Sequence, residues 1–172
     1  GNIRAGPIEA RKAGMRYLAI IVGAGPAGIA AALHLHKQRP ELCRRVLVIE
    51  KKKHPRKKLC GGGVNAKALP VLREMGVDLL QEGPQRLVAA GYDVRFEEKR
   101  RVFDEPGGTL VFDRAALDDF LCRKAKDAGI EIREEEAVEG IDFGKSAVRV
   151  RTAKAEYEAD CVVGADGVGS LV

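Results

Sequence analysis

The segment Tyr17-Leu-Ala-Ile-Ile-Val22-Gly23-Ala-Gly25-Pro-Ala-Gly28 decides how this chain folds. Its apolar run predicts a short strand buried on both faces, and the glycines that follow have the spacing G-x-G-x-x-G before a helix expected over 27–37. Gly23 permits a tight turn, Gly25 lets a diphosphate approach the backbone, and Gly28 lets the helix pack closely on the strand. The segment therefore predicts a dinucleotide-binding turn, and an ordinary glycine turn of an α/β protein is the alternative.

A second apolar strand, expected over 46–49, ends in an acidic residue. Glu50 lies 22 residues beyond Gly28, about where dinucleotide-binding proteins place the carboxylate that accepts hydrogen bonds from a ribose. A solvated acid at a strand end is the alternative. The basic run 51–58 follows directly and contains no aromatic residue. We therefore expect a solvated or phosphate-facing loop there rather than a nucleic-acid site.

Composition limits the class of protein. The chain has 172 residues, a net charge of +5 and 45% hydrophobic residues, which indicates one globular domain. The apolar runs are too short to cross a membrane, and the first residues lack the apolar core of a secretion signal. The four cysteines are scattered without metal-ligand spacing, and the three histidines show no partner pattern. These features predict a reduced, cytoplasmic protein without a metal site.

The expected fold class is α/β, with a Rossmann-like domain over 15–172. Residues 1–14 have no clear period and are expected to be a leader outside the fold. Buried parallel strands are expected over 17–22, 46–49, 130–133 and 161–163, a helix over 114–128, and a three-stranded antiparallel meander over 137–159. Residues 80–112 are expected to form a β-rich insertion on the substrate side, with Pro106-Gly107-Gly108 as a turn. A further helix is expected within 65–75, interrupted or started by Pro70.

Three separated motifs resemble the FAD-binding domain of glutathione-reductase-type flavoproteins. They are the glycine turn with its ribose acid, Phe112-Asp-Arg114 at the start of a helix, and Val162-Val-Gly-Ala-Asp-Gly167. Within these flavoproteins the chain most resembles the group that contains aromatic hydroxylases and geranylgeranyl reductases. Leu59-Cys-Gly-Gly-Gly63 is similar to a segment of geranylgeranyl reductases and related dehydrogenases. Such proteins continue with a third flavin motif and a C-terminal part, so the resemblance implies the N-terminal portion of a longer enzyme, inactive alone.

The resemblance implies FAD as the cofactor, with NAD(P)H as the candidate electron donor. The resemblance also implies which residues bind the cofactor. The expected cofactor-binding residues are Gly23, Gly25, Pro26, Ala27, Gly28, Glu50, Lys51, Cys60, Gly61, Gly62, Arg114, Val138, Gly164, Asp166 and Gly167.

Three of these residues have a competing interpretation. Arg114 would hold the phosphates or a ribose, or pair with a nearby carboxylate. Because a cation at a helix N-terminus is unfavourable, a compensating anion is expected there. Asp166 would lie at the ribityl and diphosphate region, or form a plain Asp-Gly turn. Cys60 would lie near the flavin ring, as packing or as a thiolate stabilised by the lysines at 57 and 58.

The resemblance favours an FAD-dependent oxidoreductase that reduces isoprenoid double bonds. The alternatives are an aromatic-type monooxygenase or an electron-transfer flavoprotein dehydrogenase. Two alternatives belong to a different functional class: a plain NAD-binding Rossmann domain and a non-catalytic cofactor-binding fragment. The expected partners are a small-molecule or isoprenoid lipid substrate and a redox partner. No nucleic acid is expected, and a lipid substrate would bring peripheral contact with a membrane.

Overall fold

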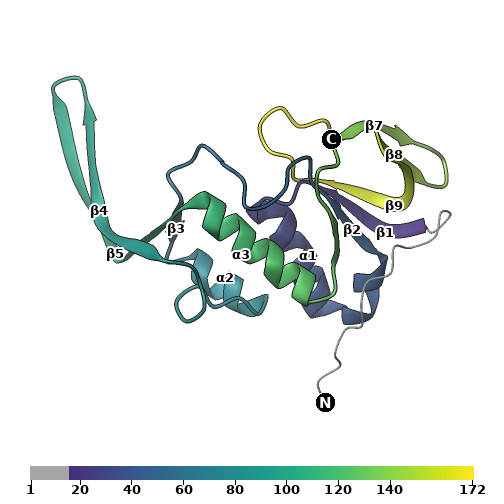
Figure 1. Ribbon diagram of the computed structural model, residues 1–172. Coiled ribbons are helices and arrows are strands. Elements are labelled where there is room, and N and C mark those ends of the chain that lie inside the picture. Colours follow the sequence, from purple (N-terminus) through teal and green to yellow (C-terminus); the bar gives the residue numbers. More distant parts are fainter. Residues whose placement is uncertain (1–15) are drawn as a thin grey trace, which may run out of the picture.

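The computed structural model describes residues 16–172, the side chain of Glu105 excepted. The expected leader over 1–14 lies outside the described residues. Six strands form the main sheet, in the order β6-β2-β1-β9-β8-β7 (Figure 1). The parallel part consists of β1 (Arg16–Val22), β2 (Val46–Ile49), β6 (Glu131–Arg133) and β9 (Glu156–Gly164). The expected α/β fold class is confirmed.

The antiparallel meander and the last parallel strand are one continuous structure. β7 (Val138–Phe143), β8 (Val148–Thr152) and β9 pair in sequence, and β9 pairs with β8 over 156–159 and with β1 over 158–164. The sequence predicted a separate strand over 161–163, whereas β9 runs without a break from Glu156 to Gly164. Consequently the segment after Gly164 leaves the sheet beside the glycine turn that follows Val22.

Two helices cover one face of the main sheet. α1 (Pro26–Gln38) buries Ile29 and Leu33, and α3 (Arg114–Asp127) buries Phe120 and Leu121 in the same apolar cluster. The other face carries a second cluster that includes Ile20, Leu47, Val150 and Tyr157. Both faces of the central strands are therefore buried, as the unbroken apolar runs predicted. A short 3-10 helix, η1 (Pro40–Arg45), leads into β2.

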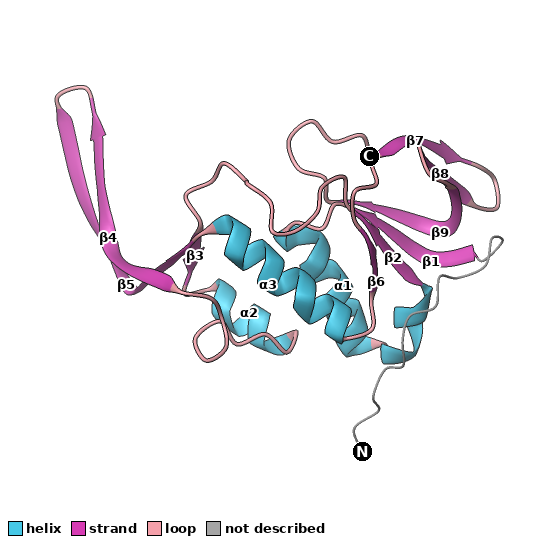
Figure 2. Ribbon diagram, viewed as in Figure 1, coloured by secondary structure: helices cyan, strands magenta, loops and turns pink. Residues whose placement is uncertain are grey.

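A smaller sheet lies on the far side of the helices (Figure 2). It has the order β3-β5-β4, with β3 (Gly63–Asn65), β4 (Arg86–Phe96) and β5 (Lys99–Phe112). The hairpin of β4 and β5 projects away from the helices (Figure 1). α2 (Ala68–Glu74) follows β3, and Pro70 is accommodated in its first turn, where a missing N–H costs little.

The expected turn at Pro106-Gly107-Gly108 is wrong. These residues lie inside β5, and the hairpin turns at Glu97, which has a φ of 52°. Gly107 and Gly108 have φ values of 87° and 71°, so they permit an irregularity within the strand. The register between β4 and β5 shifts in the same region, between Ala89 and Gly91. The glycines therefore make a bulge where the sequence suggested a reversal.

No helix within residues 16–172 is long and apolar enough to cross a membrane.

The crossing of α1 over β1 depends on the absence of a side chain at Gly28. A Cβ atom there would lie 1.9 Å from the carbonyl oxygen of Gly23 and 3.2 Å from a methyl group of Ile21. The helix can therefore approach the strand closely only with glycine at this position.

We expect Gly28→Ala to lower the free energy of unfolding by about 1–3 kcal/mol, because backbone atoms must move to admit the methyl group. Urea unfolding followed by circular dichroism measures this change. Gly61→Ala is the matched control, since a Cβ at Gly61 meets nothing within 4 Å. Equal stability of the two variants would contradict the close crossing.

Candidate functional site

The carboxyl ends of three parallel strands meet at one edge of the main sheet. The N–H of Gly23 donates to the carbonyl of Ile49 at 2.8 Å, and the N–H of Ala165 donates to the carbonyl of Val22 at 2.8 Å. The glycine turn, Glu50 and Asp166 are thereby brought to one place, which is where open α/β sheets bind their ligands.

A groove of about 440 Å³ runs along this edge. We call it the polar groove. Its walls come from the glycine turn, the basic run, the start of the meander and the segment after β9: Val22, Gly23, Gly25, Ile49, Glu50, Lys51, Lys52, Arg56, Lys57, Lys58, Glu136, Ala137, Val138, Ala165, Asp166, Val168, Gly169 and Leu171. Five of these residues are cations and three are acids, which suits an anionic ligand.

The glycine turn leaves the start of α1 open to a ligand. Gly23 has a φ of 104°, and a Cβ there would lie 2.4 Å from the carbonyl oxygen of Ala165. Gly25 occupies the N-cap position, where no side chain accepts a hydrogen bond from the first turn, and that turn contains no acidic residue. The N–H groups and the positive end of the helix dipole are thus available to an anion.

Glu50 is fixed in the floor of the polar groove. It is only 5% exposed, and its two carboxylate oxygens accept hydrogen bonds from the N–H groups of Ala24 at 2.9 Å and Lys52 at 3.0 Å. The carboxylate therefore joins the glycine turn to the loop after β2. A carboxylate oxygen can accept more than one hydrogen bond, so this position retains the capacity to receive ribose hydroxyls.

Arg56 lies across the start of α1. Its side chain is 10% exposed, and its guanidinium is 3.7 Å from Glu50 and 3.4 Å from Asp118. One of its nitrogens, Nη2, is 3.4 Å from the position that a Cβ of Gly25 would take. The buried Nε of Arg56 has no hydrogen-bond partner in the described part of the chain. A cation at a helix N-terminus with an unsatisfied donor is a site prepared for an anion.

The anion expected beside Arg114 is Asp118, one turn further along α3. Nε and Nη2 of Arg114 donate to the two oxygens of Asp118 at 2.8 and 3.0 Å. This hydrogen bonding raises the pKa of Arg114. Sequence reasoning missed Asp118. The available signal was a carboxylate set between Leu117 and Leu121 in an otherwise apolar helix stripe.

A second cavity, of about 370 Å³, lies between the three α-helices and the glycine-rich loop. We call it the apolar cavity. Except for Arg114, its lining is uncharged: Pro26, Ala30, Cys60, Gly62, Gly63, Val64, Ala68, Val71, Leu72, Met75, Leu79, Leu117 and Leu121 complete it. Gly62 holds the loop in place, because its carbonyl accepts the N–H of Phe112 at 3.1 Å.

Cys60 lies exposed at the edge of the apolar cavity. A hydrogen bond from the Gly62 backbone, and then the guanidinium of Arg114, lower the pKa of its thiol. The sequence assigned this influence to the lysines at 57 and 58. The structure assigns it to Arg114, because the chain folds the start of α3 against the loop.

The expected cofactor-binding residues divide into three groups. The polar groove contains Gly23, Gly25, Glu50, Lys51, Val138 and Asp166. The apolar cavity contains Pro26, Cys60, Gly62 and Arg114. Neither lining includes Ala27, Gly28, Gly61, Gly164 and Gly167. Of these, Gly28 acts through the helix crossing, and a Cβ at Gly164 would lie 2.8 Å from Val172.

The carboxylate of Asp166 binds residues of its own loop, the segment that follows β9. Its carboxylate accepts hydrogen bonds from the hydroxyl of Ser170 at 2.5 Å and from the N–H of Leu171 at 2.8 Å. Partial burial acts to raise the pKa of Asp166, but these hydrogen bonds outweigh burial and lower it. The carboxylate therefore closes the loop after β9 while lining the polar groove.

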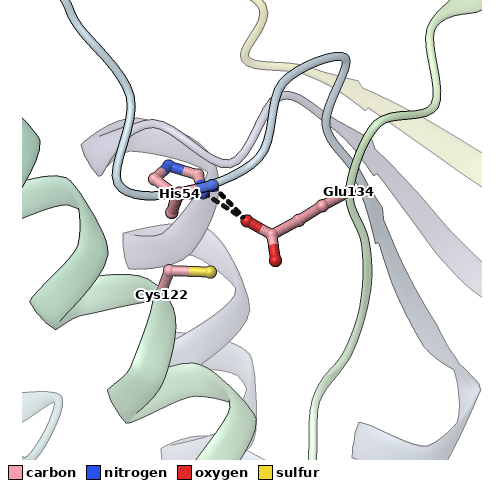
Figure 3. Close-up of side chains that lie close together, drawn as sticks. All are labelled: His54, Cys122 and Glu134. Carbon is pink, nitrogen blue, oxygen red and sulfur yellow. Dashed lines mark hydrogen bonds and ion pairs between the residues drawn. The ribbon is translucent and has the colours of Figure 1, made fainter.

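The sequence showed no partner pattern for the histidines, but the structure gives His54 a partner. Figure 3 shows His54 beside Glu134, with Cys122 of α3 close to both. Nδ1 of His54 lies 2.8 Å from Glu134, and the backbone N–H of His54 donates to the same oxygen at 2.7 Å. These three side chains are the one group in residues 16–172 with metal-ligand geometry.

Two observations argue against a cation at this cluster. The second oxygen of Glu134 already accepts a hydrogen bond from the ammonium of Lys126 at 2.6 Å. Burial raises the pKa of Cys122 to about 11, so the thiol resists the deprotonation that metal binding requires. The cluster instead ties the loop after β2 to α3 and to the residue after β6.

We expect the thiol of Cys60 to be alkylated by iodoacetamide at a lower pH than an unperturbed cysteine, whose pKa is about 8.5. The rate should be measured against pH in a Cys161→Ala background, because Cys161 is also exposed. Arg114→Gln should raise the midpoint, since the thiolate loses a cation, while the Gly62 hydrogen bond keeps part of the effect. An unchanged midpoint would contradict the role of Arg114.

Comparison with known proteins agrees with this geometry. An uncharacterized protein of Methanosarcina barkeri is 31% identical over 166 residues, which cover 91% of this chain and 39% of that protein. A menaquinone reductase of Mycobacterium tuberculosis is 32% identical over 115 residues, covering 64% and 27% of the two chains. The 12-dehydrotetracycline 5-monooxygenase/anhydrotetracycline 6-monooxygenase of Streptomyces rimosus is 29% identical over 169 residues, covering 92% and 32%. The chain thus spans two fifths or less of the length of these relatives.

A solved structure shares the fold. A variant of the halogenase PltM in complex with FAD superposes with a TM-score of 0.76 at 19% identity, covering 91% of this chain and 35% of that one. The family described as FAD binding domain matches residues 16–172, which include both cavities and every expected cofactor-binding residue. The chain belongs to this family of FAD-binding domains.

Proposed function

We propose that this chain is the FAD-binding part of a flavin-dependent oxidoreductase that reduces double bonds of an isoprenoid substrate, as geranylgeranyl reductases do. One observation carries the proposal: the polar groove meets the apolar cavity at the first turn of α1. Gly25 lines the groove and Pro26, the next residue, lines the cavity. A charged dinucleotide and an apolar substrate would therefore be held side by side.

The residues of the polar groove fit the diphosphate of FAD. The open N-terminus of α1 and the cation of Arg56 offer donors and positive charge to the two phosphates. The unsatisfied Nε of Arg56 would gain a partner. Glu50 lies where it can accept hydrogen bonds from the adenosine ribose, and Lys51 and Lys52 border it. Residues of the basic run line this groove beside the glycine turn, and this position supports a bound diphosphate over a nucleic-acid partner.

FAD supplies hydride chemistry when it is bound and reduced. The apolar cavity would exclude water from a hydrocarbon substrate, because its walls are aliphatic apart from Arg114. Its volume lies within the range of small-molecule sites. The similarity to a menaquinone reductase supports a substrate of this kind, since a menaquinone carries an isoprenoid side chain. NAD(P)H as the electron donor, a redox partner, a cytoplasmic location and peripheral membrane contact are parts of the same proposal.

A monooxygenase is the second candidate. The similarity to the tetracycline monooxygenase of Streptomyces rimosus favours it, and an apolar cavity beside a flavin would also suit an aromatic substrate. The two candidates differ in what is added to the substrate: two hydrogens for the reductase, one oxygen atom for the monooxygenase.

We expect Gly25→Val to lower FAD affinity by at least about tenfold while leaving the fold intact. The added side chain would occupy the approach of the diphosphate, yet a Cβ at Gly25 meets no backbone atom and only Nη2 of the Arg56 side chain, at 3.4 Å. Flavin absorbance of the purified protein and circular dichroism measure the two effects. Ala31→Val, on the exposed side of the same helix, is the control. Normal flavin content in Gly25→Val would argue against a phosphate site at this turn.

The reaction is best tested on the complete protein, loaded with FAD and reduced by dithionite without oxygen. With geranylgeranyl diphosphate we expect product masses that increase by two hydrogens for each double bond saturated. A parallel assay with NADPH, oxygen and an aromatic substrate tests the second candidate. Oxygen incorporation without saturation would favour the monooxygenase and reject the reductase.

A further inference from the structure

We propose that Asp118 is a positioning residue whose buried carboxylate holds Arg56 and Arg114 on the two sides of the start of α1, ready to receive a diphosphate. The identity of that ligand rests on the proposed function. The positioning itself rests on contacts within the chain.

Asp118 joins two segments that are distant in the sequence. Its side chain is fully buried, at 0% exposure. It binds Arg114, from its own helix, through two hydrogen bonds of 2.8 and 3.0 Å. It also lies 3.4 Å from Nη2 of Arg56, which belongs to the loop after β2. One carboxylate thus fixes an arginine that lines the polar groove and an arginine that lines the apolar cavity.

The arrangement requires a negative charge. Two guanidinium groups that approach the same point repel each other, and each also lies at a helix N-terminus, where a cation is unfavourable. Arg56 crosses the first turn of α1, and Arg114 is the first residue of α3. Asp118 offsets both effects while no ligand is bound. Without it, Glu50 would be the remaining acid within reach of Arg56.

The loss of Asp118 would therefore act on ligand binding in two ways. Arg56 would no longer be held in front of Gly25. Its guanidinium would also be free to pair more closely with Glu50, the carboxylate that the proposed FAD site reserves for the ribose. The charge of Asp118 weakens the attraction for phosphate, but a preorganised pair of arginines outweighs this, because ordering them on binding costs conformational entropy.

A neighbouring ion pair provides a matched control. Asp119 and Arg123 have the same spacing on the same helix, with a contact of 2.9 Å, but the Arg123 side chain is 62% exposed and lies outside both cavities. Exposed pairs of this type contribute little. Asp119→Asn therefore removes an equivalent charge from α3 without touching the proposed arrangement.

The first measurement needs no ligand. In the cofactor-free protein, the Nε–H groups of Arg56 and Arg114 should give exchange-protected NMR signals, because both are buried or hydrogen-bonded. Asp118→Asn should abolish the protection of the Arg114 signal, because its Nε–H donates to Asp118 at 2.8 Å. It should also shift the Arg56 signal, because Nη2 of that guanidinium loses the carboxylate at 3.4 Å, whereas Asp119→Asn should leave both signals unchanged. A protected Arg114 signal or an unshifted Arg56 signal in folded Asp118→Asn would overturn the proposal.

The second measurement separates positioning from general destabilisation. We expect Asp118→Asn to lower the affinity for FAD and ADP by about tenfold or more, and to lower the affinity for adenosine, which has the ribose but no phosphate, by a clearly smaller factor. Isothermal calorimetry serves for FAD and ADP, and NMR titration for adenosine. An equal loss for adenosine would indicate a merely structural role and would overturn the proposal, as would wild-type affinity for ADP.

Arg56→Gln keeps the proposal testable if Asp118→Asn does not fold. It retains the pair of Arg114 and Asp118 and removes one of the two cations. If Asp118 acts through Arg56, the loss of ADP binding free energy in the double variant should be smaller than the sum of the losses in the two single variants. If Asp118→Asn does not fold, Arg56→Gln alone decides. The Arg114 Nε–H must stay protected in it, and the affinity for ADP must fall by a larger factor than the affinity for adenosine; loss of the Arg114 signal or an equal loss for both ligands would overturn the proposal.

A failure of the proposed function can be distinguished from a failure of this inference. If the wild-type protein bound neither FAD nor ADP, the assignment of the polar groove would be rejected. The ligand-free NMR comparison would still decide whether Asp118 positions the two arginines.

Discussion

The close crossing of α1 over β1 is the constraint on which the site depends. No side chain can stand between Gly28 and the carbonyl of Gly23, since a Cβ would come within 1.9 Å of that oxygen. The crossing fixes the direction of α1 and places its first N–H groups at the edge where β1, β2 and β9 end. The helix dipole, the polar groove and the apolar cavity take their positions from this contact.

Electrostatics then determine how the site is kept open for an anion. The start of α1 attracts negative charge, yet the side chain that crosses it is the cation of Arg56. Glu50 and Asp118 hold this cation from two sides. Acids placed beside an anion site are unfavourable for the ligand, but here they are bonded to backbone N–H groups or to arginines. They therefore order the site with little cost to its affinity.

Much of the fold follows from local signals. The boundaries of β1, α1, β2 and α3 lie within one or two residues of those expected from the apolar runs and the glycines that flank them. The position of the turn in the β4–β5 hairpin was predicted wrongly, because Pro106-Gly107-Gly108 has the composition of a turn. Its glycines instead take positive φ values within a long strand whose partner shifts register opposite them. Pairing across strands decided the outcome, and composition carries no information about that pairing.

By itself the sequence determined the glycine turn and the acid at the end of β2, because these depend on spacing within one β-α-β unit, and the resemblance of three separated motifs indicated FAD. Only the tertiary structure decided that Asp118 joins Arg56 to Arg114, that Arg114 rather than a lysine acts on Cys60, and that His54 binds Glu134. Each of these contacts brings together side chains from elements distant in the chain. The packing of α3 against α1 and the loop after β2 sets them, and no local pattern encodes that packing.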